Sequence, residues 1–92
     1  MRHRGRPKKA RIVKQDPSIS QFSPRGKPGR PDEACIGIDG FEAIRLTDCL
    51  GLSQKAAAES MGVSQQTISR ILKNTRKSIA EAIVKGKIIR IQ

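Results

Sequence analysis

The fold is decided by the stretch SQKAAAESMGVSQQTISRILK, residues 53–73. Ser53 can cap a helix over about residues 54–61, and Ser64 can cap a second helix, because a serine oxygen accepts an unpaired backbone N–H at a helix start. Gly62 lies between the two helices, where the backbone has to turn in a left-handed or similarly tight conformation. We therefore expect two consecutive helices joined by a very short turn.

The apolar residues of this stretch suit two helices that cross at close range. Ala58 is small at the point where the helices approach each other, and the branched side chains of Val63, Ile68 and Ile71 can fix the angle between them. This spacing predicts a helix-turn-helix. A plain helical hairpin shows the same pattern and remains the alternative.

The helix that begins after Ser64 meets no Gly or Pro before Gly86, and its helical period separates two sides. The apolar side comprises Ile68, Ile71, Leu72, Thr75, Ile79 and Ala82. The polar side and the helix start hold the candidate DNA-contacting residues Ser64, Gln65, Gln66, Thr67, Ser69, Arg70, Lys73, Arg76 and Lys77. In a major groove, Gln pairs with adenine, Arg pairs with guanine, and later basic residues meet phosphates. A solvated polar face is the alternative, although acids are almost absent from this side.

One more helix and two strands are expected around this unit. Cys35–Ile38 and Lys87–Ile91 are short β-prone runs that flank the helices, so they could pair into a small two-stranded ribbon. A first helix is predicted over about residues 40–50, where Asp39 and Glu42 form a capping-box pattern. The expected fold class is mainly α: a three-helix helix-turn-helix domain with this β ribbon, preceded by an extended basic arm.

The charge of the chain is large and uneven. The net charge is +11, and residues 1–30 alone carry +9, from ten Lys and Arg against one acid. Residues 31–63 carry −4, and residues 64–92 carry +6. Such a surplus favours a polyanionic partner, and its distribution predicts that the two ends of the chain build the anion-binding surface.

Residues 1–33 are interpreted as the N-terminal arm and residues 34–92 as the DNA-binding domain. All five prolines and few large apolar residues fall in this arm, so burial cannot offset the entropy cost of ordering it. We expect the arm to be largely disordered, with Phe22 as the point where it docks on the domain.

The beginning of the arm carries a second DNA-binding signal. Its sequence RGRPKK, residues 4–9, resembles the core of an AT-hook, in which glycine lets the backbone lie deep in a narrow minor groove and arginines enter its negative potential. Arg4, Arg6, Lys8 and Lys9 therefore join the candidate DNA-contacting residues. A non-specific electrostatic arm is an equal alternative.

Composition argues against several other classes of protein. Phe22 and Phe41 are the only aromatic residues, which favours duplex over single-stranded nucleic acid. Cys35 and Cys49 lack metal-ligand spacing and are expected to be small buried residues in a reducing cytoplasm, and His3 is the only histidine. We therefore expect no metal, no cofactor and no enzymatic activity. No long apolar run or signal peptide is seen, so a cytoplasmic protein without a membrane partner is expected.

Five short pieces of the sequence match a known protein family. They are GRPKK (5–9), FSPRG (22–26), EAIRL (42–46), AA (57–58) before MGVS (61–64), and GK (86–87) before Ile91. At these residues the sequence resembles a family of small bacterial and archaeal proteins, catalogued as uncharacterised, with a helix-turn-helix related to region four of sigma factors. The resemblance spans nearly the whole chain.

The resemblance implies a transcriptional regulator that binds double-stranded DNA, and a homodimer would double its short site. It brings no operator, ligand or catalytic activity. Because sigma-like domains also bind polymerase, the alternative is a protein-interaction module that docks on RNA polymerase or another regulator. RNA is a further alternative, since a basic arm attracts any polyanion. Gly40 and Gln65 depart from the family pattern, where an acidic residue and Arg are usual, and Gln65 could alter the base preference.

Overall fold

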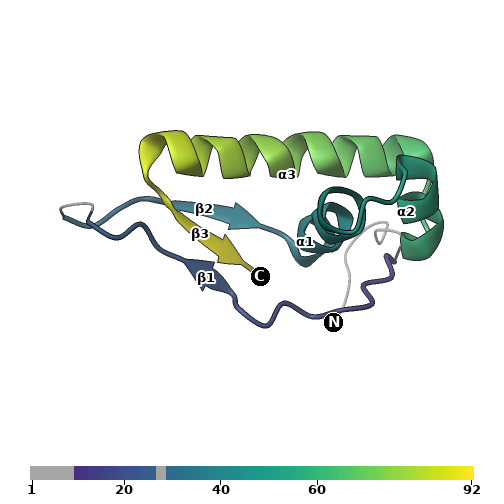
Figure 1. Cartoon of the computed structure of the whole chain (residues 1–92), viewed down its shortest axis with the longest axis horizontal. Helices are drawn as coiled ribbons and strands as arrows, with labels where there is room; N and C mark the ends of the chain where they lie inside the picture. Colours follow the sequence, from purple (N-terminus) through teal and green to yellow (C-terminus); the bar gives the residue numbers. More distant parts are fainter. Residues whose placement is uncertain (1–9, 27–28) are drawn as a thin grey trace, which may run out of the picture.

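One long helix organises the fold. The computed structural model describes residues 10–26 and 29–92. The elements in chain order are β1 (Gln21–Phe22), β2 (Glu33–Ile36), α1 (Ile38–Ile44), the π-helical turn η1 (Arg45–Cys49), α2 (Gln54–Met61), α3 (Gln65–Lys85) and β3 (Ile88–Ile91). The sheet lies beneath the C-terminal half of α3, and α1 and α2 pack at its N-terminal half (Figure 1). The protein is mainly α with a small β part, as predicted.

The sheet has three strands in the order β1-β3-β2. The two strands expected from the sequence do pair, in parallel, with Glu33 opposite Ile88. β1 adds an antiparallel pair to the other edge of β3, with Gln21 opposite Arg90. The first expected strand lies two residues earlier than predicted, because Ile38 already belongs to α1.

The start of α1 differs from the predicted capping box. The helix begins at Ile38 with Gly37 as its N-cap and no side-chain cap. The Asp39 carboxylate accepts a hydrogen bond from the neighbouring Gly40 N–H and forms an ion pair with Arg11. The Glu42 carboxylate is bound by Arg45 and by the Lys14 N–H instead. The last part of the predicted helix is η1, where the Leu50 N–H donates five residues back to the Arg45 carbonyl at 2.9 Å.

The α2 and α3 helices match their predicted bounds. The Ser53 hydroxyl accepts from the Ala56 N–H and the Ser64 hydroxyl accepts from the Thr67 N–H, each at 3.0 Å. Gly62 adopts the left-handed conformation, with φ of 66°, that lets α2 turn directly into α3. The core between the helices consists of Ala43, Leu46, Ala57, Ala58, Met61, Ile68, Ile71 and Leu72. The predicted apolar side of α3 is thus buried, apart from the half-buried Ile79.

A close approach joins α1 to α3 at Gly40. A Cβ atom on Gly40 would meet the Thr75 hydroxyl oxygen and stand 3.2 Å from an Ile36 methyl group. Gly40 is buried and so is Thr75. The absence of a side chain at position 40 therefore lets α1 lie directly against α3.

The segment 10–26 is attached to the domain. The Ile12 N–H donates to the Met61 carbonyl at 3.0 Å, the Lys14 N–H donates to Glu42 at 3.0 Å, and β1 extends the sheet. These main-chain bonds hold a segment that was expected to be disordered. β2 begins at Glu33, so the boundary expected between residues 33 and 34 falls inside this strand.

The two cysteines were expected to be buried, and this was wrong. Cys35 and Cys49 are both exposed. Cys35 lies on the outward side of β2, whose residues alternate between exposed and buried, and Cys49 ends η1 next to solvent. In the described ranges, no helix is long and apolar enough to cross a membrane.

Candidate functional site

The candidate site is the exposed face of α3. Its members are exposed as predicted: Ser64, Gln65, Gln66, Ser69, Arg70, Lys73, Arg76 and Lys77. Thr67 is half-buried, and its hydroxyl accepts a hydrogen bond from the Ser64 hydroxyl at 2.9 Å within the helix cap. Ser64 and Thr67 therefore stabilise the start of α3, and the other residues form the face itself.

The N-terminal end of this face is electropositive. The first turn of α3 contains no acidic residue, and its unpaired backbone N–H groups add the positive end of the helix dipole. Arg70, Lys73 and Lys77 follow along the face. None of these three side chains has a carboxylate partner among residues 10–26 and 29–92. The face thus presents free cations and amide groups to solvent.

Arg76 is the exception on this face. Its guanidinium binds the Asp48 carboxylate in a bidentate pair, with Nη2 to Oδ1 at 2.8 Å and Nε to Oδ2 at 3.1 Å. Both side chains are about half exposed, at 48% and 50%. The hydrogen bond that Arg76 donates to Asp48 raises the pKa of Arg76. Asp48 could not be linked to Arg76 from the sequence, because the two residues are 28 positions apart and no local pattern connects them.

The N-terminal segment passes beside the turn that precedes α3. Ile12 bonds to Met61, the last residue of α2, and its side chain lies against Gly62. Ala10, the first described residue, is therefore only two residues from a fixed point at this turn. The predicted contacts Arg4, Arg6, Lys8 and Lys9 lie outside the described residues.

Glu42 clamps this segment to α1. Its carboxylate is fully buried and accepts bonds from Arg45 Nε at 2.8 Å, Arg45 Nη2 at 2.9 Å and the Lys14 N–H at 3.0 Å. The hydrogen bonds from Arg45, and then the one from Lys14, hold the pKa of Glu42 below its ordinary value against the opposing effect of burial. The sequence suggested a helix cap for Glu42, and the actual partner from position 14 had no sequence signal.

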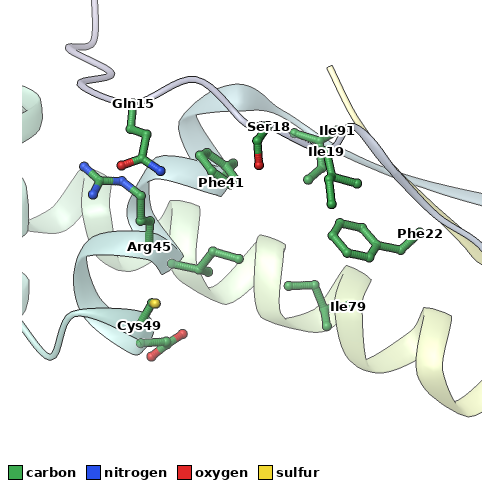
Figure 2. A pocket seen from close by; sticks show the side chains of 11 residues that line it. Gln15, Ser18, Ile19, Phe22, Phe41, Arg45, Cys49, Ile79 and Ile91 are labelled. Atoms are coloured by element: carbon green, nitrogen blue, oxygen red, sulfur yellow. The ribbon is translucent and has the colours of Figure 1, made fainter.

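A groove opens on the side of α3 that carries Arg76. It has a volume of about 550 Å³ and lies between the N-terminal segment, α1, η1 and α3. Figure 2 shows an apolar end with Ile19, Phe22, Ile79 and Ile91, and a polar end with Gln15 and Arg45. Phe41, Ile44, Asp48, Cys49 and Ser18 complete the lining. The prediction that Phe22 docks on the domain fits its place in β1 and in this wall.

Similar chains occur in bacteria and archaea. The chain is 43% identical over 89 residues to a "UPF0251 protein" of Prosthecochloris aestuarii, covering 96% of this chain and 57% of that protein. It is 42% identical over 88 residues to a "UPF0251 protein" of Thermoanaerobacter pseudethanolicus, covering 95% of this chain and 75% of that protein. A "UPF0251 protein" of Methanococcus maripaludis is 37% identical over 89 residues, covering 96% of this chain and 68% of that protein.

The chain thus spans little more than half the length of the Prosthecochloris relative and about three quarters of the Thermoanaerobacter one. No solved structure matches it. The match to the family model extends over the entire sequence, residues 1–92, including both the N-terminal segment and α3. This chain therefore belongs to the family described as "Protein of unknown function DUF134".

Proposed function

We propose that the protein is a transcriptional regulator that binds double-stranded DNA, with α2, the turn at Gly62 and α3 acting as a helix-turn-helix. The observation that carries the proposal is the exposed face of α3, with its capped and acid-free start and its unpaired cations Arg70, Lys73 and Lys77. A recognition helix needs such a face, because its first turns contact base edges and its later basic residues contact phosphates.

The residues of the face are assigned roles by their position along α3. Gln65, Gln66 and Arg70 lie in its first two turns, and their side chains have the donors and acceptors that recognise adenine and guanine in the major groove. Lys73 and Lys77 follow one and two turns later and are assigned to phosphates. Arg76 is held by Asp48 in the free protein, so we assign it a phosphate contact that requires it to leave this carboxylate.

The attachment of Ile12 beside Gly62 supports a role for residues 4–9 in the same interface. A segment that starts from the turn before α3 begins next to the helix end that would enter the major groove. Arg4 and Arg6 can then reach the neighbouring minor groove, and Lys8 and Lys9 the phosphates between the two grooves.

The proposal is tested with the full chain and random duplex DNA. Selection of bound sites, followed by fluorescence anisotropy on the selected duplex, is expected to show sequence-specific binding that weakens as salt increases. Arg25→Ala is a matched control for Arg70→Ala, because Arg25 is also an exposed arginine but lies between β1 and β2, outside the proposed helix-turn-helix. Absence of duplex binding at low salt would contradict the proposal, and so would an equal loss of affinity for the selected duplex in Arg70→Ala and Arg25→Ala.

A protein-interaction module that docks on RNA polymerase or another regulator is the second candidate. One observation favours it: Ile83 and Val84, near the end of α3, are 72% and 81% exposed. Adjacent apolar side chains in such an exposed position are a common feature of protein interfaces, including those of homodimers. If this end of α3 contacts only protein, the double variant Ile83→Ser, Val84→Ser is expected to leave the affinity of a single chain for duplex DNA unchanged.

A further inference from the structure

We infer that the groove between the N-terminal segment and α3 is a binding site for a small carboxylic acid with an apolar body. Its volume of about 550 Å³ falls in the range of small-molecule sites, which is roughly 300–1,000 Å³. Ile19 and Phe22 form one wall and remain more than half exposed. Ile79 lies across from them, so a flat or branched hydrocarbon group can lie between these side chains (Figure 2). Ile44 adds to the apolar lining.

The polar end of the groove offers hydrogen-bond donors to a ligand. A guanidinium has five N–H donors, and Arg45 uses its Nε and one on Nη2 for Glu42. Its other N–H groups have no partner within the described part of the chain, and neither does the side-chain amide of Gln15 beside it. The nearby carboxylates of Glu42 and Asp48 are each already bound by an arginine. This end therefore offers unused donors, which suit a carboxylate.

The same groove connects to the exposed face of α3. Asp48 lines the groove and holds Arg76, while Ile79 lines it directly from α3. A carboxylate bound near Asp48 adds negative charge beside the Asp48–Arg76 pair and changes how readily Arg76 is released. This coupling to DNA rests on the proposed function, whereas the binding site itself does not.

The site is tested by NMR titration of the full chain at low salt, with 3-phenylpropanoate and its neutral analogue 3-phenylpropanamide as probes. We expect the acid to shift the amide signals of residues 18–22, 44–49 and 79 with a Kd below about 1 mM, and the amide to bind about tenfold more weakly. Equal binding of the two probes, or shifts outside the groove only, overturns the assignment.

Two matched variants separate the groove from general charge effects. Ser18 and Ser20 are both exposed, but only Ser18 lines the groove. Ser18→Asp adds a carboxylate to the site without removing packing and is expected to weaken 3-phenylpropanoate about tenfold. Ser20→Asp is expected to leave the Kd unchanged, and an equal loss in both variants overturns the site.

A second titration tests the coupling. 3-Phenylpropanoate at a concentration near its Kd for the wild-type chain is expected to change the affinity of that chain for its selected duplex. The same concentration is expected to have much less effect on Ser18→Asp, because a variant that binds the acid about tenfold more weakly is then largely unoccupied. An unchanged DNA affinity in the wild type overturns the coupling. If the wild-type chain binds no duplex at all but 3-phenylpropanoate still shifts the groove signals, the proposed function is refuted and the ligand site stands. The two outcomes can be told apart because the NMR titration contains no DNA.

Discussion

Glu42→Gln is expected to destabilise the domain and to loosen the N-terminal segment. The Glu42 carboxylate is fully buried and accepts two bonds from Arg45 and one from the Lys14 N–H. The amide removes the charge and one acceptor oxygen, and the Arg45 side chain, 18% exposed, can reach water only in part. Hydrogen bonds to a buried charged group contribute roughly 1.5–3 kcal/mol, so we expect a loss of about 2 kcal/mol. For a domain of this size that lowers the Tm by roughly 8–16 °C.

The effect also depends on pH. Because the pKa of Glu42 is lower in the folded chain than its ordinary value of 4.5, the stabilisation is present above pH 4.5 and is lost as the pH falls through the folded pKa. Circular dichroism melting at pH 7 and at acid pH is the assay, and the difference between wild type and Glu42→Gln should shrink in acid. Glu33→Gln is the control, since its ion pair with Arg90 is exposed. Equal Tm losses in both variants at pH 7 would refute the reasoning.

Three further predictions concern the proposed DNA interface and the core. Arg70→Ala should cost about 1–3 kcal/mol on the selected duplex and relax one base position, whereas Lys77→Ala should weaken all duplexes alike, and anisotropy on selected and random DNA tests both. Deleting residues 1–9 should reduce the slope of log affinity against log salt concentration by about 0.9 for each phosphate contact that is lost. An unchanged slope would show that these residues do not contact the DNA. Gly40→Ala should lower the free energy of unfolding by about 1–3 kcal/mol in urea, because its Cβ meets the Thr75 hydroxyl. Thr75→Ala in the same chain should then recover part of the loss, and failure to do so would argue against this contact.

Asp48 is positioned to compete with DNA for Arg76 in the proposed interface. Its carboxylate binds Arg76 on the face assigned to DNA, so a phosphate has to compete with it for the guanidinium. Asp48→Asn would remove both this competition and a negative charge near the duplex. If the face binds DNA as proposed, exchange of this pair would be favourable only where the rest of the face fits the DNA closely enough to offset its loss, which would favour specific over non-specific binding.

The sequence by itself determined the helices around the turn. The bounds of α2 and α3 follow from Ser53, Ser64, Gly62 and Gly86, and the structure has them at these positions. The signals are reliable because a cap or a helical turn joins groups only three or four residues apart, so neighbouring residues suffice to specify it. The exposed polar side of α3 was predictable for the same reason, since the helical period places its residues on one side.

Only the tertiary structure decided which distant groups meet. The capping-box pattern at Asp39 and Glu42 had the right spacing, but Glu42 is drawn instead to Arg45 and to a main-chain N–H at Lys14, because burial of a carboxylate requires charged or hydrogen-bonding partners. The Asp48–Arg76 pair and the attachment of Ile12 beside the turn likewise join residues far apart in the chain. Such contacts depend on how the helices and strands pack together, and the largely polar composition of residues 10–26 gave no indication of them.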